Sequence, residues 1–378
     1  MIPAIFMGMM SGTSLDGVDG VAAQIEPSGQ LRVLAHSFVP FAPAFRDLLM
    51  QLNESGPDEL HRAALAGNGI SRHYAQVAHD LLAQTQLTPS DVTALGAHGQ
   101  TVRHRPLEFD GDPAMQQAAV GYTIQLINPS LLAELTGMDV VCDFRNRDLS
   151  AGGQGAPLVP AFHHGVFGQS DTTVAVLNIG GIANLSVLHP DGSVLGWDCG
   201  PGNALMDYWC SIHTGASFDH KGAWSATGIV NPDLLATLMA EPFLQRLPPK
   251  STGRDLFNPA WLKTRLPIDG YRAQDIQATL TEFTAMACAH DIQHQAPLAR
   301  ELIVCGGGAL NEQLMRRLAH HLPGLQVTNS QVRGLPPLQV EAAAFAWLAF
   351  KTVRRETSSL PSVTGARGAR VLGAIYPR

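Results

Sequence analysis

Two stretches of the chain share one pattern of apolar and polar positions. In residues 4–39, the apolar runs AIFMGMM and GVAAQI flank a turn rich in glycine, serine and threonine, and a PSG turn precedes a third run, LRVLAHSFV. Residues 173–200 repeat this layout, with a GG turn after the first run and a PDG turn before the third. Short apolar runs bounded by such turns predict two three-stranded meanders. The repetition predicts an internally duplicated α/β protein whose halves each offer a small turn to a shared cleft.

Helical periodicity marks the segments between and after the meanders. Apolar spacing predicts a helix over 57–82, broken near Gly67-Asn68-Gly69, and a long, largely buried helix over 274–292. Residues from the 240s to 265 are rich in turn formers and indicate a loop-rich insertion. Shorter helices are predicted over 129–136, 202–212 and 312–321, and short strands over 91–97 and 138–143.

The length of 378 residues is enough for two domains, each with its own core. We expect an N-terminal lobe over 1–135 and a C-terminal lobe over 136–349. Residues from about 350 to 378 are expected to pack back on the first lobe.

Composition narrows the class of protein. A hydrophobic content of 45%, a charged content of 15% and a net charge of −7 are typical of a soluble globular protein and disfavour nucleic acid or an anionic membrane as partners. The five cysteines form no CxxC pair, which argues against a disulfide framework or structural zinc. The apolar N-terminus lacks a basic region, and no apolar run is long enough to span a bilayer. We therefore expect a cytoplasmic protein.

The first turn, residues 12–19, combines glycines, hydroxyls and two carboxylates. Glycine leaves no Cβ between backbone and ligand, so successive N–H groups can converge on an anion. Asp16 alone would repel a phosphate, but Mg²⁺ binds carboxylate and phosphate oxygens together. The turn thus predicts a site for a Mg-nucleotide. An ordinary glycine-rich hairpin with aspartate at its turn is the alternative.

Phosphate binding would have to come from backbone and hydroxyl groups, because the Walker A pattern GxxxxGK[ST] is absent. Gly306-Gly307-Gly308 follows a predicted strand and would let a purine lie against the backbone, although these glycines taken alone favour a tight strand-to-helix turn. Asp198 follows the third strand of the second meander, where a general base for phosphoryl transfer belongs. A helix N-cap is the alternative for Asp198, but Asn203 is better placed for it.

Polar clusters follow two of the predicted strands. They are HGQT at 98–101 and DFRNRD at 143–148, the latter followed by GGQGAP. Glutamine and aspartate suit sugar hydroxyls, and an arginine fork suits a carboxylate. For Arg147 and Asp148, an ion pair in a surface loop remains the alternative.

Seven strings together closely resemble the anhydro-N-acetylmuramic acid kinase family, within the superfamily of acetate and sugar kinases, Hsp70 and actin. They are GMMSGTSLDGVD, AHGQTVRH, DFRNRDLSAGGQGAPLVPAFH, NIGGIANLS, DCGPGNALMD, KSTGRDLFN and VCGGGALN. The resemblance covers nearly the whole chain. It implies a two-lobed, actin-like ATPase fold of the ribonuclease H-like type with a central cleft, and a homodimer. It also implies an ATP-dependent enzyme of peptidoglycan recycling that opens the 1,6-anhydro bond with water and phosphorylates O6, giving MurNAc-6-phosphate and ADP.

The resemblance also implies a role for individual residues. Asp198 would be the base, and Glu341 would be a second catalytic carboxylate that assists Asp16 with Mg²⁺. The ATP site would comprise Gly12, Thr13, Ser14, Leu15, Asp16, Gly17, Val18, Asp19, Gly180, Gly181, Gly306, Gly307, Gly308 and Asn311. The sugar side would comprise His98, Gln100, Thr101, Asp143, Arg145, Gln154 and Asn203.

Two features depart from the family pattern: Ile127 stands where relatives often carry glycine, and residues 111–120 form a longer loop than usual. Two rival functions remain. One is a conformational ATPase of the chaperone or filament type, which would have no need of HGQT or GGQGAP. The other is a kinase for a different sugar, against which only the family-specific strings argue.

Overall fold

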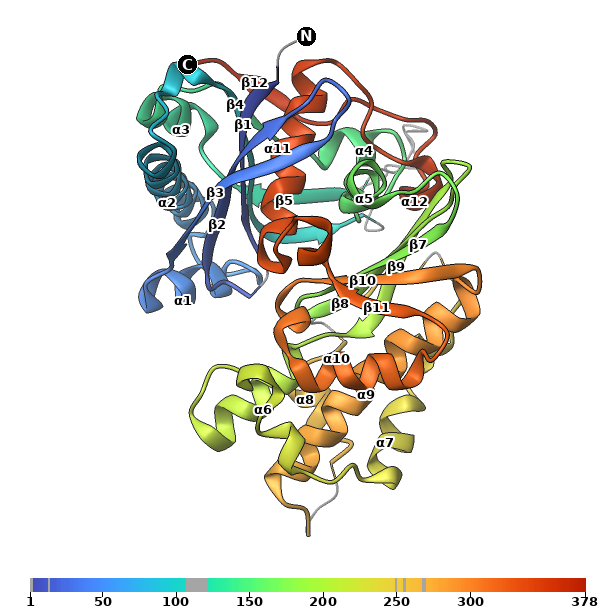
Figure 1. Ribbon diagram of the computed structural model, residues 1–378. Helices are drawn as coiled ribbons and strands as arrows, with labels where there is room; N and C mark the ends of the chain where they lie inside the picture. Colours follow the sequence, from blue (N-terminus) through green and yellow to red (C-terminus); the bar gives the residue numbers. More distant parts are fainter. Residues whose placement is uncertain (1–2, 13, 107–120, 249, 254–255, 267–269) are drawn as a thin grey trace, which may run out of the picture. The chain divides into compact units, whose positions relative to one another are not determined.

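The computed structural model describes residues 3–12, 14–106, 121–248, 250–253, 256–266 and 270–378. The chain divides into two compact units, one formed by Met1–Val166 with Gln339–Arg378 and the other by Phe167–Leu338. Each unit is built on one β-sheet with helices packed against it (Figure 1). Residues 107–120, which include the long loop noted above, lie outside the described residues.

The sheet of the first unit has the strand order β12-β6-β4-β1-β2-β3, and β5 pairs with the far end of β4. β1, β2 and β3 form the expected antiparallel meander, while β4 runs parallel to β1 and β6 parallel to β4. The strands are β1 (Ala4–Ser11), β2 (Gly17–Ile25), β3 (Leu31–Pro40), β4 (Val92–Arg105), β5 (Tyr122–Leu126), β6 (Val140–Cys142) and β12 (Ala374–Tyr376).

The boundary between the units differs from the predicted one at 135/136. β6 pairs with β4, and β12 pairs with β6, so the residues just after 136 complete the first sheet. The chain also returns to the first unit at Gln339, earlier than expected, because α11 (Val340–Val353) packs on β1, β2 and β4. A Cβ on Gly8 would stand 2.1 Å from the Ala342 carbonyl oxygen, so α11 lies directly against the backbone of β1.

Helix α2 (Glu59–Thr85) is continuous, and the break predicted near Gly67-Asn68-Gly69 is therefore wrong. A Cβ on Gly69 would stand 2.7 Å from the Phe45 ring, and one on Gly67 would stand 3.6 Å from the Ile127 backbone. Close packing therefore explains the glycine at position 69, whereas position 67 has room for a Cβ. The other helices of the unit are α1 (Pro43–Gln51), α3 (Pro129–Thr136), α4 (Asn146–Ser150), α5 (Val159–Phe167) and α12 (Pro361–Thr364).

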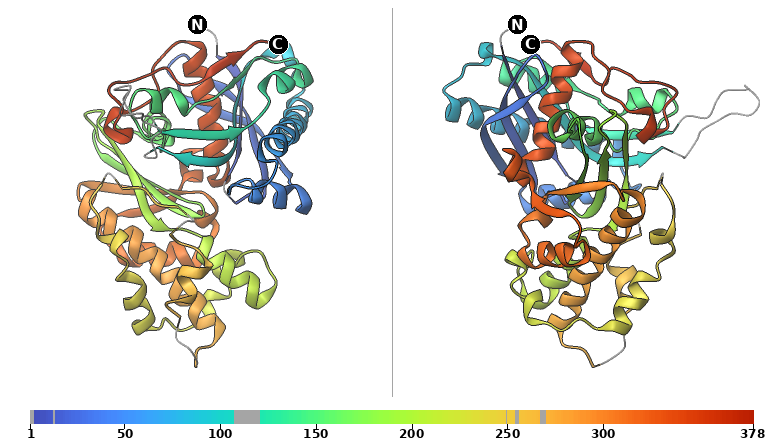
Figure 2. Two further views of the ribbon diagram at one scale, coloured as in Figure 1. Left: turned by 180° about the vertical axis from the view of Figure 1, so that it is seen from behind. Right: turned by 45° about the vertical axis from the view of Figure 1, so that its right-hand side comes forward.

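The sheet of the second unit has the order β11-β10-β7-β8-β9. β7, β8 and β9 form an antiparallel meander, and β10 and β11 run parallel to β7. Read from the third strand of each meander, β9-β8-β7-β10-β11 repeats β3-β2-β1-β4-β6, which confirms the predicted duplication. Figure 2 shows the ribbon from two further directions. The strands are β7 (Thr173–Ile179), β8 (Ile182–Leu188), β9 (Val194–Pro201), β10 (Ala299–Cys305) and β11 (Gln326–Asn329).

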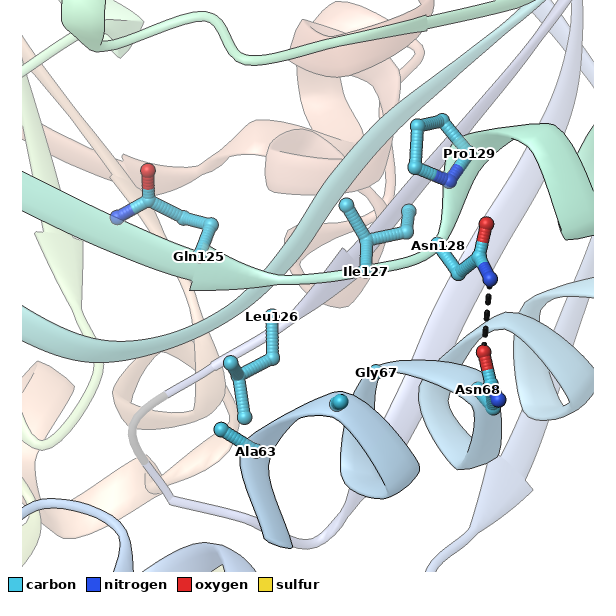
Figure 3. A pocket seen from close by; sticks show the side chains of 9 residues that line it. Ala63, Gly67, Asn68, Gln125, Leu126, Ile127, Asn128 and Pro129 are labelled. Atoms are coloured by element: carbon cyan, nitrogen blue, oxygen red, sulfur yellow. Dashed lines mark hydrogen bonds between the residues drawn. The ribbon is translucent and has the colours of Figure 1, made fainter. Parts of the chain in front are cut away.

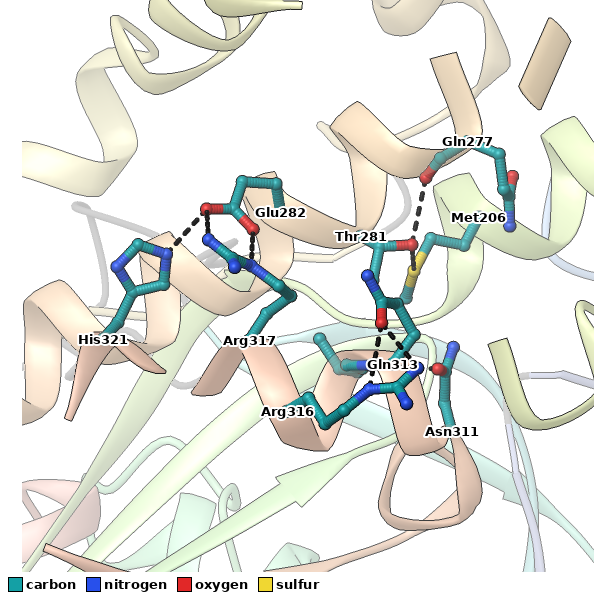
Figure 4. Close-up of polar contacts among 10 residues, drawn as sticks. Met206, Gln277, Thr281, Glu282, Asn311, Gln313, Arg316, Arg317 and His321 are labelled. Carbon is teal, nitrogen blue, oxygen red and sulfur yellow. Dashed lines mark hydrogen bonds and ion pairs between the residues drawn. The ribbon is translucent and has the colours of Figure 1, made fainter. Parts of the chain in front are cut away.

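The long helix α9 (Ala273–Gln295) forms the centre of the second unit's helical layer and is largely buried, as predicted. Its buried Glu282 accepts hydrogen bonds from Arg317 and His321 of α10 (Figure 4). Trp261, from the segment predicted to be a loop-rich insertion, stacks on Phe283 of α9 and belongs to the core. The remaining helices are α6 (Ala204–Thr214), α7 (Pro232–Met239), α8 (Pro259–Lys263) and α10 (Glu312–His321).

No helix in the described part of the chain combines the length and the apolar character needed to cross a membrane.

Candidate functional site

The turn between β1 and β2 is shorter than the predicted phosphate loop. Leu15, at φ 57°, is buried, and its N–H donates to the Gly12 carbonyl at 3.3 Å. The Ser14 hydroxyl donates to Asp16 Oδ1 at 2.7 Å, and the Asp16 side chain is exposed. Thr13 lies outside the described residues. The turn therefore presents one exposed carboxylate beside a backbone bend.

The last three residues of the predicted loop, Gly17, Val18 and Asp19, belong to strand β2. Val18 is fully buried in the core of the first unit. Asp19 Oδ1 lies 3.0 Å from His36 Nε2 on the neighbouring strand β3. In the structure, Val18 packs in the core and the Asp19 carboxylate bonds to a strand neighbour.

A hydrogen-bond network joins the end of β1 to the HGQT string of β4. The Gly99 N–H donates to Tyr74 Oη at 3.1 Å, and the Ser11 hydroxyl donates to the Gly99 carbonyl at 3.2 Å. Gln100 Nε2 donates to the Gly12 carbonyl at 3.2 Å. Gln100 Oε1 is buried and accepts no hydrogen bond from any described residue. These bonds thus hold the turn after β1 against the HGQT string, and Gln100 Oε1 remains an acceptor without a donor among the described residues.

His98 and Arg145 form a second link. His98 Nδ1 donates to the Gly99 carbonyl at 2.8 Å, and Arg145 Nε donates to His98 Nε2 at 3.0 Å, so the imidazole is neutral. Burial, and then the charge of Arg145, lower the pKa of His98 well below its ordinary value. Burial also lowers the pKa of Arg145 to about 10, opposed by the charge of Glu341. The structure therefore gathers His98, Arg145 and Glu341, which are distant in sequence.

Of the other residues predicted for the sugar side, Thr101 lies within β4, Asp143 directly after β6 and Gln154 in the loop after α4. Asp143 follows β6, is exposed, and accepts a hydrogen bond from Asn146 at 2.7 Å. Thr101 accepts one from Gln125 at 3.2 Å. Gln154 is half-buried, and its N–H donates to the Thr364 carbonyl at 2.9 Å.

A pocket of about 470 Å³ adjoins the HGQT string (Figure 3). Gln125, which bonds to Thr101, forms one wall, and Asn68 and Asn128 bond to each other at 2.8 Å. Sequence reasoning missed this pocket, although it named Gly67, Asn68 and Ile127 for other reasons. It is lined by Ala63, Ala64, Gly67, Asn68, Gln125, Leu126, Ile127, Asn128 and Pro129.

In the second unit, the Gly180-Gly181 turn is fixed to the start of α6. The Gly180 carbonyl accepts the Asn203 N–H at 2.7 Å, and the Gly181 carbonyl accepts the Gly202 N–H at 3.0 Å. Asn203 Nδ2 donates to the Ile179 carbonyl at 3.1 Å, so its side chain does not cap α6. The start of α6 therefore sets the position of the second glycine turn.

Asn203 belongs to the second unit, where it lies beside the third glycine segment, whereas the other residues predicted for the sugar side belong to the first unit. A Cβ on Gly307 or on Gly308 would stand 3.3 Å from the Asn203 amide. Gly306, at φ 77°, leads from β10 into this segment. The Asn311 side chain caps α10 by accepting the Leu314 N–H at 3.0 Å. The second unit thus brings Gly180-Gly181 and Gly306 to Gly308 together around Asn203.

Asp198 lies on β9, not at a helix N-terminus, so the N-cap alternative is wrong. Its Oδ2 accepts hydrogen bonds from the Ser251 hydroxyl at 2.8 Å and the Thr252 N–H at 3.0 Å. Burial raises the pKa of Asp198, and these two bonds partly offset that effect. No described residue donates to Oδ1. Sequence reasoning placed Ser251 and Thr252 in an insertion; the family string KSTG was their only signal.

A magnesium ion bound with a nucleotide fits the first turn. Mg²⁺ usually takes one or two protein carboxylates and completes its shell with phosphate and water. Asp16 supplies an exposed carboxylate of this kind. Among the described residues, no group of three or more His, Cys, Asp or Glu side chains could hold a metal ion. The donor set therefore suits an ion that arrives with phosphate.

The repeated strand order, with the second strand antiparallel in each sheet, defines a duplicated ribonuclease H-like protein of the class that includes actin-like ATPases and sugar kinases. The model of the anhydro-N-acetylmuramic acid kinase family matches residues 4–378. The chain belongs to this family.

Two relatives from this family match the chain over all or nearly all of its length. The anhydro-N-acetylmuramic acid kinase of Variovorax paradoxus (strain S110) is 61% identical over 383 residues, covering 100% of both chains. That of Albidiferax ferrireducens is 55% identical over 394 residues, covering 99% of each. Among solved structures, component A of the (R)-2-hydroxyglutaryl-CoA dehydratase of Acidaminococcus fermentans has a TM-score of 0.49 at 11% identity, covering 93% of this chain and 99% of that one.

Proposed function

We propose that this chain phosphorylates 1,6-anhydro-N-acetylmuramic acid at O6 while water opens the anhydro bond, giving MurNAc-6-phosphate and ADP in peptidoglycan recycling. The oxygen of water bonds to C1, its proton passes to Asp198, and the C1–O6 bond breaks. O6 then takes the γ-phosphoryl group of ATP, and ADP leaves. Family membership along the chain supports this reaction.

The observation that carries the proposal is the state of Asp198. Both hydrogen bonds to its carboxylate go to Oδ2, which leaves Oδ1 able to accept a proton. A general base works best when its pKa lies near the working pH, and burial shifts the pKa of Asp198 upward in that direction. Ser251 and Thr252 hold the carboxylate in one orientation, as a base aimed at a bound water requires.

On the nucleotide side, we propose that the β1–β2 turn and Gly180-Gly181 bind the phosphates of ATP. Gly306 to Gly308 would lie against the adenosine. Mg²⁺ would be held by Asp16, assisted by Glu341 in the first turn of α11, and would neutralise charge on the phosphates. Asn203, which lies by the glycines of the second unit, fits this nucleotide group better than the sugar group.

On the sugar side, we propose that Arg145 and Gln100 make the main polar contacts. Arg145 uses Nε and Nη1 within the protein, and Nη2 donates to no described residue, which suits the lactyl carboxylate of the substrate. Gln100 Oε1 suits a sugar hydroxyl or amide N–H, because a buried acceptor without a donor is costly. Asp143, Gln154, His98 and Thr101 complete this group.

Replacing the base tests the proposal. We expect Asp198→Asn to lower kcat by about 10²- to 10⁴-fold, because the base is lost, while the dissociation constant for ATP stays close to wild type. The measurement is coupled ADP release with mass spectrometry of the sugar product, and Asp191→Asn, at an exposed turn of the same unit, is the matched control. Turnover of Asp198→Asn near the wild-type rate would remove Asp198 from the mechanism.

The rival functions are separated by the same assay. A conformational ATPase would release phosphate at a rate that added sugar does not change. A kinase for another sugar would prefer MurNAc or glucose to the anhydro sugar. We also propose that the protein is a cytoplasmic homodimer, and measuring its mass in solution tests the dimer.

A further inference from the structure

The loop that follows α4 is hydrogen-bonded to the buried carboxylate of Asp148. Asp148 is 0% exposed, and its Oδ2 accepts the Gly155 N–H at 2.8 Å. Its Oδ1 accepts the Thr364 hydroxyl at 2.9 Å. Asp148 is therefore not the surface ion-pair residue that the sequence allowed. A buried charge is costly unless it is hydrogen-bonded, so both bonds are needed to keep it there.

The C-terminal segment runs along the same loop. The Gln154 N–H donates to the Thr364 carbonyl at 2.9 Å, and the Arg367 N–H donates to the Ala151 carbonyl at 2.9 Å. A Cβ on Gly153 would stand 2.2 Å from Asp148 Oδ2, so the loop packs directly on the carboxylate. Thr364 and Arg367, more than 200 positions away in sequence, thus fix the backbone of the loop that carries Gln154.

The backbone of Gly155 connects Asp148 to Arg145. Arg145 Nη1 donates to the Gly155 carbonyl at 2.7 Å, while the Gly155 N–H is held by Asp148. Arg145 Nε is held in turn by His98 at 3.0 Å. The guanidinium is therefore oriented from two sides, and one of them depends on Asp148 and Thr364.

We propose that Thr364 and Asp148 are positioning residues that hold Arg145 and Gln154 in the geometry that binds the sugar. This inference rests on the proposed function, which places Arg145 and Gln154 at the sugar. A binding group must be held to within about 0.5 Å of its productive position by the residues behind it. Thr364 is 2% exposed and lies behind the loop, so it acts on binding through its hydrogen bonds.

The test is a set of threonine variants with separate kinetics for each substrate. Thr364→Val keeps the shape but removes the hydroxyl, and we expect KM for the anhydro sugar to rise about tenfold or more while KM for ATP stays within about twofold. Thr364→Ser keeps a hydroxyl and is expected to restore sugar KM. Thr136→Val is the matched control, because Thr136 is a buried threonine of the same unit that bonds only within its own helix.

Asp148→Asn is made in parallel. It puts an amide donor opposite the Gly155 N–H or the Thr364 hydroxyl, and it is expected to raise KM for the sugar in the same way. This variant tests the proposal even where Thr364→Val is too unstable to purify. A Thr364→Val enzyme with unchanged sugar KM overturns the positioning role. So does one in which both KM values rise equally together with a fall in Tm. Wild-type protein that does not turn over the anhydro sugar would instead overturn the proposed function, and the inference with it.

Discussion

At the scale of single residues, the proposed chemistry, with Asp198 as the base, depends on how this carboxylate is held. Burial raises the pKa of its carboxyl, while hydrogen bonds from Ser251 and Thr252 oppose that rise by stabilising the charged form. A base must be ionised before it can take a proton. The acid side of the pH–rate profile therefore reports the balance between burial and these two bonds.

Ser251→Ala shifts this balance. The variant loses one hydrogen bond to the carboxylate, so the pKa of Asp198 rises further and activity begins to fall at a higher pH than in the wild type. The measurement is kcat/KM for the sugar as a function of pH. Ser193→Ala is the matched control, since Ser193 donates to the exposed carboxylate of Asp191 at 2.6 Å in the same unit. An unchanged acid limb in Ser251→Ala would show that this bond does not tune the base.

Sequence alone proposed Asp198 as the base but did not show which residues hold its carboxylate. The string DCGPGN places a carboxylate at the end of a meander, which is a local pattern. Ser251 lies 53 residues further on, and its contact with Asp198 is created by the fold. The same reason hid Asp148, because its burial depends on Thr364, 216 residues away.

At the scale of elements, α2 shows that a glycine in a helix can serve packing. Gly67 and Gly69 lie two residues apart in one continuous helix, but their surroundings differ. A Cβ on Gly69 meets the Phe45 ring at 2.7 Å, which is closer than van der Waals contact allows. A Cβ on Gly67 finds ordinary contact distances near Ile127.

The two glycines therefore respond in opposite directions to the same substitution. Gly67→Ala is expected to stabilise the protein by up to about 1 kcal/mol, because alanine favours helix and no atom has to move. Gly69→Ala is expected to destabilise it by about 1–3 kcal/mol, because Phe45 must shift. Thermal and urea unfolding of the two variants measure both effects, each serving as control for the other. Equal effects would mean that packing at Gly69 is not limiting.

The pattern of apolar positions predicted α2, α3, α6, α9 and α10 but missed other helices, among them α11, and it misjudged the length of β4. Helix α3 matches 129–136 and α10 matches 312–321, because both have a capping residue and an apolar stripe. Strand β4 was predicted too short, since its outer half is polar and is paired by β5 from beyond the segment 107–120. Contacts of that kind have no local signature.

At the scale of the whole molecule, three histidines with strongly lowered pKa values lie in the same unit. Burial lowers the pKa of His163 to about 3 and that of His104 to about 4, and the pKa of His98 is lowered well below its ordinary value. All three belong to the first unit. Their pKa in the unfolded chain is about 6.5, so below that pH the unfolded chain binds more protons than the folded one.

The protein is therefore expected to lose stability as pH falls from about 6.5 to about 4, by up to about 1.4 kcal/mol per pH unit for each histidine. His163→Gln should lessen this slope by about a third, measured as the free energy of unfolding in urea at a series of pH values. His61→Gln, at an exposed position of α2, is the control. A slope that His163→Gln leaves intact would assign the acid sensitivity to other groups.

The return of the chain to the first unit at Gln339 also has a consequence for biosynthesis. The second unit is one uninterrupted segment, whereas the first unit lacks α11 and β12 until the ribosome has made residues 339–378. Domains generally fold as units during synthesis. The second unit can therefore fold on the ribosome first, and β1, although translated before the second unit, must wait for α11 to cover it.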